Sequence, residues 1–264
     1  MNLLRSYKAE SLWGAVCRRF PYLLVVLVTF SVSLPADEVL PLEEPKQTLI
    51  FGYLEFPPFY YTNEQGEPEG PLVDMAYAIA HKAGYGVRMV SMPPKRAINF
   101  VSIGEIELWL GLASNVLYKQ NILVSQFPVE QLELKVFSDL DMTDFTLEQL
   151  HGRNVVVERG YSYGGFTRQL REPESDITLV EVNSLAQGVN VLRIREMDYL
   201  VAYQQSIDDL VETQKNKPLL EKPLNSYIVS YLPVHMTLYK DMPNAEDIMA
   251  ELEQAQRELM LIKQ

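Results

Sequence analysis

The chain has 264 residues, 22% of them charged, and a formal net charge of -12 at pH 7. This length suffices for one large domain or two smaller lobes with a substantial apolar core. Because no Lys- or Arg-rich surface is evident against the acidic background, we expect no nucleic-acid partner.

Residues 1–36 differ from the rest, because basic residues precede an apolar run over 21–33. The run is shorter than the roughly 20 apolar residues of a membrane-spanning helix, and small residues follow it. We predict a signal peptide over 1–36, cleaved after Ala36, and export to the periplasm, with an uncleaved anchor as the alternative. The one cysteine, Cys17, precedes the apolar run. The mature chain therefore has no disulfide or thiol chemistry.

After a Pro- and Glu-rich linker at 37–47, short β-rich segments alternate with helical patterns. The first helix is predicted to end at Gly84, and the last to begin after Asn244. Thr146-x-x-Gln149 and Ser184-x-x-Gln187 fit capping boxes. Strands are expected at 48–54, 86–92, 107–113, 131–137, 154–160, 176–182, 197–203 and 228–239, with a further helix over 94–104. This alternation predicts an α/β architecture.

The segment Gly160-Tyr161-Ser162-Tyr163-Gly164 matches G-x-S-x-G, the turn that presents a nucleophilic serine in α/β-hydrolases. Asp198 and His235 follow it in the order of that catalytic triad. Against a hydrolase, no H-G-G-G-type loop lies upstream, and His235 lies in an apolar strand. We favour a helix beginning near Ser162, whose hydroxyl caps that helix or contacts a ligand, and whose N–H groups favour polar or anionic groups.

Nucleotide and metal sites are not indicated. The turn lacks the G-K-[ST] ending of a phosphate loop. His81, His151 and His235 lie far apart in sequence, without H-x-x-x-H spacing. We therefore expect no metal and no cofactor.

Several segments, read in order, carry a family resemblance: LIFGYLEFPPFYY, GPLVDMAYAIA, GEIELWLGL, SQFPV, LEQLHGRNVVVERGYSYGGF and REMDYLVAY. From about residue 48 to 260 the chain resembles the family 3 bacterial extracellular solute-binding proteins, receptors of polar amino-acid uptake systems. The resemblance implies the type II periplasmic-binding-protein fold, with two α/β lobes joined by two hinge strands and closing on a ligand. Lobe 1 would comprise 48–130 plus 232–264, and lobe 2 would comprise 131–231.

The resemblance also implies site residues. In amino-acid receptors of the family, an Arg in lobe 1 holds the ligand carboxylate and an Asp in lobe 2 holds the amine. Alignment places Lys119 and Tyr203 at these two positions, which puts a standard amino-acid ligand in doubt. The remaining candidates are an aromatic wall, a Thr-equivalent serine, a basic residue and the turn of lobe 2: Tyr53, Phe56, Ser114, Arg96, Glu158, Tyr161 and Ser162. We expect an aromatic or hydroxyl-rich ligand, or a small anion held by Lys119 and Arg96.

The function implied is that of a non-enzymatic, monomeric periplasmic protein that delivers a small polar ligand to an ABC-type permease or a sensor. An enzyme on the same fold, similar to the periplasmic cyclohexadienyl dehydratases, is one alternative, with Glu158 supplying the acid. A degenerate interaction module whose cleft binds no solute is the other.

Overall fold

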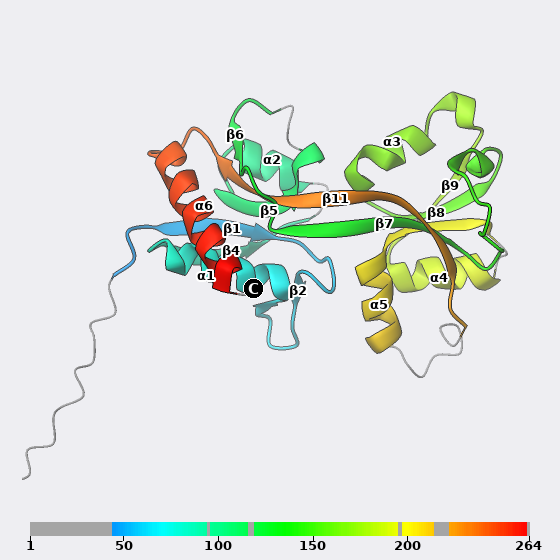
Figure 1. The fold of residues 1–264 in the computed structure, drawn as a ribbon, viewed down its shortest axis with the longest axis horizontal. Coiled ribbons are helices and arrows are strands. Elements are labelled where there is room, and N and C mark those ends of the chain that lie inside the picture. Colours follow the sequence, from blue (N-terminus) through cyan, green and yellow to red (C-terminus); the bar gives the residue numbers. More distant parts are fainter. Residues whose placement is uncertain (1–43, 94–95, 116–118, 195–196, 214–221, 263–264) are drawn as a thin grey trace, which may run out of the picture. The chain divides into compact units, whose positions relative to one another are not determined.

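The structure is a computed structural model that describes residues 44–93, 96–115, 119–194, 197–213 and 222–262. These residues belong to one compact unit, Glu44–Gln264 (Figure 1). The predicted signal peptide, its cleavage position and most of the linker lie outside the described residues. Within those ranges, no helix has the length and apolar content needed to cross a membrane.

The described strands form a nine-stranded sheet and a two-stranded sheet. The large sheet has the order β4-β1-β5-β11-β7-β10-β8-β9, with β6 also paired to β11, while β2 pairs with β3. The bounds are β1 Thr48–Tyr53, β2 Tyr61–Thr62, β3 Pro68–Glu69, β4 Gly86–Ser91, β5 Leu108–Leu112, β6 Ile122–Val124, β7 Glu130–Ser138, β8 Asn154–Glu158, β9 Thr178–Val182, β10 Tyr199–Tyr203 and β11 Asn225–Tyr239.

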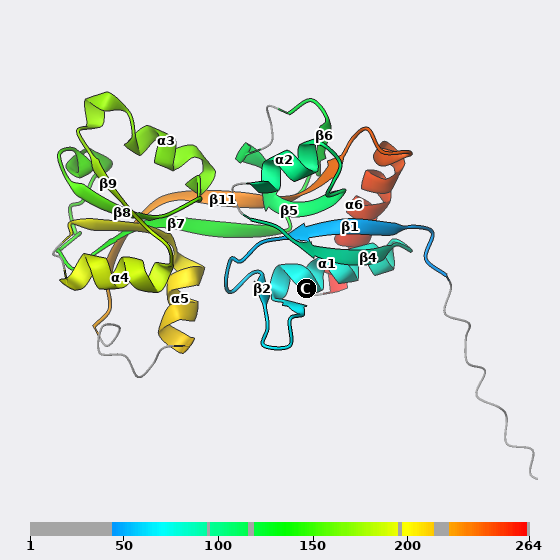
Figure 2. The same ribbon diagram turned by 180° about the vertical axis from the view of Figure 1, so that it is seen from behind.

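Helices follow most strands, as the α/β pattern predicts. The α-helices are α1 Pro71–Lys82, α2 Ala97–Ser102, α3 Phe166–Leu170, α4 Leu185–Ile194, α5 Gln204–Thr213 and α6 Ala245–Ile262. Single turns of 3-10 helix are η2 Ala113–Asn115, η3 Leu147–Leu150, η4 Tyr163–Gly165 and η5 Pro173–Ser175. Helices α1, α2 and α6 gather around β1, β4 and β5, whereas α3, α4 and α5 gather around β8 to β10 (Figure 2).

Two long strands connect these two groups of elements. The end of β11, from Val234 onward, pairs with β5 and β6, whereas its first two thirds pair with β7. Strand β7 in turn pairs with β10. Strands β7 and β11 therefore lie side by side and carry the sheet from one group to the other (Figure 1). This arrangement confirms the two connecting strands that the resemblance implies.

Burial explains why the central strands are continuous apolar runs. Every residue of β5 and β10 is buried, as are the three valines of β8, Val155 to Val157. Although the sheet is mixed, these strands are covered on both faces and have no solvent-facing side, so polar alternation disappears. Along α1, by contrast, only one face is buried, formed by Leu72, Val73, Ala76, Ile79 and Ala80.

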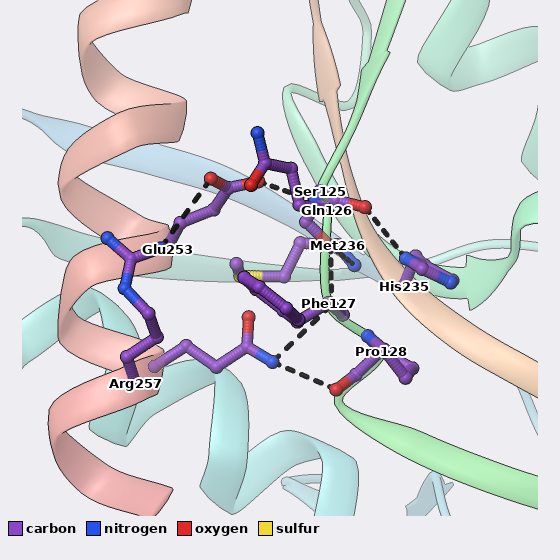
Figure 3. A network of polar contacts seen from close by, with 9 residues as sticks. Ser125, Gln126, Phe127, Pro128, His235, Met236, Glu253 and Arg257 are labelled. Atoms are coloured by element: carbon purple, nitrogen blue, oxygen red, sulfur yellow. Dashed lines mark hydrogen bonds and ion pairs between the residues drawn. The ribbon is translucent and has the colours of Figure 1, made fainter.

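The crossing from β6 to β7 is held by polar contacts to α6 and β11 (Figure 3). The backbone N–H of Gln126 donates to Glu253 at 2.6 Å, and Nδ1 of His235 lies 2.8 Å from the Ser125 carbonyl oxygen. The amide of Gln256 donates to the Pro128 carbonyl oxygen at 2.9 Å. These bonds fix the start of β7, where the chain leaves the first group of elements.

The predicted strands all have counterparts in the structure. Helix α1 ends at Lys82, just before the predicted stop at Gly84, and α6 begins directly after Asn244, as predicted. The sequence missed β2, β3 and β6, which have two or three residues each. Ser184 caps α4, because its Oγ accepts the N–H of Gln187 at 3.2 Å. The capping box at Thr146 is wrong: η3 is a single 3-10 turn, and Thr146 makes no side-chain cap bond.

Candidate ligand-binding pocket

The turn after β8 does not begin a regular helix. Gly164 and Gly165 have φ of 68° and 100°, and the helix that follows, α3, has five residues. A helix does begin beside Ser162, as predicted, but it is the single 3-10 turn η4, followed by the short α3, and the Ser162 side chain makes no cap bond. Instead of capping, the Ser162 hydroxyl donates to Oδ1 of Asn115 at 2.8 Å.

The hydrolase hypothesis fails on the same geometry, since each member of the supposed triad binds elsewhere. Ser162 is bonded to Asn115, and His235 to the Ser125 carbonyl oxygen. Asp198 accepts the backbone N–H of Asn154 at 2.9 Å through Oδ2. The three side chains do not assemble into a catalytic triad.

Phe56, in the loop after β1, is the centre of an aromatic cluster. Its ring centroid lies 5.3 Å from that of Phe59, 5.5 Å from that of Tyr161 and 5.2 Å from that of Tyr203. Tyr163 lies 5.9 Å from Tyr161 and 5.3 Å from Tyr203, again between centroids. Such pairs contribute about 0.5–1.5 kcal/mol each beyond the area they bury. The cluster holds the loop after β1 against the ends of β8 and β10.

Hydrogen bonds fix the same loop on both sides of Phe56. The Tyr161 hydroxyl donates to the Glu55 carbonyl oxygen at 2.8 Å, and the Ser206 hydroxyl donates to the Pro57 carbonyl oxygen at 2.9 Å. Since Tyr161 follows β8 and Ser206 belongs to α5, two separate elements hold the loop after β1 by hydrogen bonds.

Beside this cluster lies a pocket with a volume of about 330 Å³. Its lining comes from the loop after β1, the end of β8, the start of α4 and one face of α5: Phe56, Pro57, Glu158, Tyr161, Ser184, Leu185, Ala186, Ser206, Asp209, Leu210 and Thr213. A small adjoining chamber shares Phe56, Glu158 and Tyr161 and adds Tyr163 and Tyr203. The volume lies at the small end of the range typical of ligand sites.

Two carboxylates of this pocket are electrostatically perturbed. Burial raises the pKa of Glu158 from 4.5 to about 7. Burial, and then the charge of Glu212, raise the pKa of Asp209 above its ordinary value. Within the described chain, the Glu158 carboxylate has no ion pair and no hydrogen bond to offset the loss of water. Burial and the nearby Glu158 charge also keep the Tyr161 phenol neutral by raising its pKa.

The structure brings together some of the predicted site residues and separates others. Phe56, Glu158, Tyr161 and Tyr203 line the pocket or its adjoining chamber. Ser162 binds Asn115 of η2, which packs against η4. The others do not line these spaces: Arg96 and Ser114 are exposed, Lys119 is half-buried, and Tyr53 is buried with its hydroxyl 3.1 Å from Thr62 Oγ1.

The sequence analysis missed the contribution of α4 and α5. Ser206, Asp209, Leu210 and Thr213 follow the i, i+3, i+4, i+7 spacing of one helix face. The sequence did contain a signal for this contribution: one face of α5 carries polar residues together with a buried leucine. A helix face that packs only on a core usually lacks such polar residues. The sequence did not show which loop would lie against that face of α5.

Comparison with known families decides the membership of the chain. A model of the bacterial extracellular solute-binding proteins, family 3, matches residues 49–230. The chain belongs to this family. A comparison with curated proteins gives no match.

Solved structures agree with this family 3 assignment at the level of the fold. An ancestral arginine-binding protein bound to arginine has a TM-score of 0.63 at 20% identity, covering 81% of this chain and 92% of that one. Holo ArgBP from T. maritima has a TM-score of 0.61 at 20% identity, covering 81% and 90%. The GLUR0 ligand-binding core with L-glutamate has a TM-score of 0.61 at 18% identity, covering 82% and 94%. The fold of this family 3 member is thus the two-lobed type II periplasmic-binding-protein fold.

Proposed function

We propose that the chain is a solute-binding protein that captures a small polar ligand between two lobes and presents it to an ABC-type permease or a sensor. The proposed lobes are 48–130 plus 232–264 and 131–231. The observation that carries the proposal is the pocket of about 330 Å³ between Phe56 and Pro57, from the first lobe, and β8, α4 and α5, from the second. A pocket lined from two lobes can close on its ligand by hinge motion.

Family membership supports the same proposal. The solved structures of similar fold include proteins bound to arginine and to L-glutamate. A ligand of that size suits a pocket of this volume. We further propose that the chain is exported to the periplasm by its N-terminal segment and acts there as a monomer, without cofactor.

A thermal-shift screen tests the proposal. The purified protein is screened against amino acids, organic acids, sugars, amines and polyamines, because a ligand that binds only the folded state raises the melting temperature. Ala186→Phe narrows the pocket and should abolish any shift, whereas Asn190→Phe, at an exposed position one turn further along the same helix and outside the pocket lining, should not. If no compound of any class shifts the melting temperature, the solute-binding proposal fails and the interaction-module alternative gains support.

One observation favours a second candidate, an enzyme similar to the cyclohexadienyl dehydratases. A carboxyl group whose pKa is about 7 is partly protonated at neutral pH and can act as a general acid. The assay is turnover of prephenate or arogenate by the purified protein and by Glu158→Gln. Turnover that disappears in Glu158→Gln would establish the enzyme, and its absence in the unaltered protein would exclude this reaction.

A further inference from the structure

We infer that the pocket takes an organic cation, whose ammonium or guanidinium group lies among Glu158, Asp209 and the rings of Phe56 and Tyr161. This inference rests on the proposed solute-binding function and specifies its ligand class. It differs from the small anion that the sequence suggested, because Lys119 and Arg96 do not line the pocket.

The charge of the lining is the first argument. Its described residues include two acids, Glu158 and Asp209, and no Lys or Arg. The carboxylate of Glu158 is partly buried and has no partner in the part of the chain that the structure describes. A carboxylate removed from water without a partner is unfavourable, and a cation in the pocket would supply the missing partner. An anion would instead add to the repulsion.

The aromatic rings are the second argument. Phe56 and Tyr161 line the same pocket as the two acids, and their ring centroids lie 5.5 Å apart. Aromatic rings attract cations over their faces, most strongly where water is excluded. Rings and carboxylates together select an organic cation over a hydrated metal ion. Within the described ranges, moreover, no three His, Cys, Asp or Glu side chains gather as a metal site would require.

The third argument is a tyrosine hydroxyl beside the adjoining chamber. Tyr203 is 4% exposed and lines the adjoining chamber, and no hydrogen bond of its hydroxyl exists among the described residues. An ammonium or guanidinium N–H in the chamber can donate to the tyrosine oxygen.

The affinity should depend on pH in a defined direction. A cation binds the ionised form of Glu158, so protonation on lowering the pH from 8 to 6 weakens binding. The other groups around it are also acidic or phenolic: Asp209 and Glu212 on α5, Glu55 in the loop after β1, Tyr161 and Tyr163 after β8, and Tyr203 at the end of β10. None of them becomes more negative as the pH falls, so none can reverse this trend.

The experiment compares three compounds with one skeleton and different charge. Phenethylammonium, 2-phenylethanol and phenylacetate are titrated into the purified protein by calorimetry at pH 8, with agmatine as a second cation. We expect a cation to bind at least about tenfold more tightly than the neutral and anionic compounds. Glu158→Gln should weaken the cation at least about tenfold, while Glu55→Gln, a nearby acid outside the lining, should change it less than about threefold. Melting temperatures confirm that both variants are folded.

Each other outcome has a defined meaning. Equal or tighter binding of the neutral or anionic compound overturns the inference, as does a Glu158→Gln variant that binds the cation normally. If neither cation binds but the wider screen finds an uncharged or anionic ligand, the inference is wrong and the solute-binding proposal stands. If no compound in any class binds, the solute-binding proposal itself is refuted.

Discussion

Replacing Glu158 by glutamine should stabilise the fold, and only above the pH at which the unfolded side chain ionises. The folded protein raises the pKa of this carboxyl from 4.5 to about 7 because burial disfavours the charged form. Between these values the folded state holds its proton more tightly than the unfolded state. Stability is therefore lost as the pH rises from 4.5 to 7, and the cost is complete above pH 7.

The size of this destabilisation follows from the difference between the pKa values of Glu158 in the unfolded and folded states. Each pH unit corresponds to about 1.4 kcal/mol, so the ionised carboxylate would destabilise the fold by about 3 kcal/mol at most. Because Glu158 is only partly buried, solvent screening lowers this figure, and we expect about 2 kcal/mol at pH 8. Glutamine has the same shape and no charge, so Glu158→Gln should recover that amount at pH 8 and nothing at pH 4.

The assay is urea unfolding of the unaltered protein and of Glu158→Gln at several pH values from 4 to 8. The difference in the free energy of unfolding should grow from near zero to about 2 kcal/mol across this range. Glu174→Gln, an exposed acid on η5, is the matched control and should show no such growth. If the two curves of Glu158→Gln and the unaltered protein stay parallel at all pH values, the desolvation of Glu158 is refuted.

Three further predictions concern packing. Gly164→Ala should lower the free energy of unfolding by at least about 1 kcal/mol more than Gly152→Ala. Both glycines have a positive φ, 68° and 70°, so the backbone strain is the same in the two variants. Only at Gly164 would the added Cβ meet a side chain, that of Leu232 at 2.8 Å. Equal losses in urea unfolding would show that Leu232 moves aside freely. Gln256→Ala should cost about 2 kcal/mol, since it removes a buried amide that donates to Pro128, whereas Gln254→Ala on the exposed side of α6 should cost under about 0.5. A small loss at Gln256 would mean that water replaces its bonds. Phe56→Ala should cost about 2 kcal/mol, compared with under about 1 for the exposed Phe127→Ala, and similar losses in thermal unfolding would exclude the aromatic cluster as a stabilising contact.

The strands were readable from the sequence because each is a short apolar run bounded by turn residues. The runs that became β5, β8 and β10 are apolar at nearly every position, and the structure buries them on both faces. The short strands β2, β3 and β6 escaped because two or three residues carry no periodicity. The G-x-S-x-G motif around Ser162 was misleading, because five residues in sequence do not specify which side chains surround the serine in the fold.

Only some residues of the candidate site could be predicted from the sequence. Phe56, Glu158 and Tyr161 could be named in advance because they lie at strand ends, where the family resemblance places a cleft. Ser206 and Asp209 could not, because a helix face reveals its own spacing and not the loop that packs on it.

The sequence by itself determined the α/β alternation, the longer strands and the family, since these depend on local periodicity and on the order of motifs along the chain. Only the tertiary structure decided what the segments around Tyr161 do. It sets the loop after β1 against β8, β10 and α5, and it leaves the Glu158 carboxylate without a partner among the described residues, beside a pocket. The physical reason is that the pKa of a carboxyl and the lining of a pocket depend on residues distant in sequence, whose approach no local pattern records.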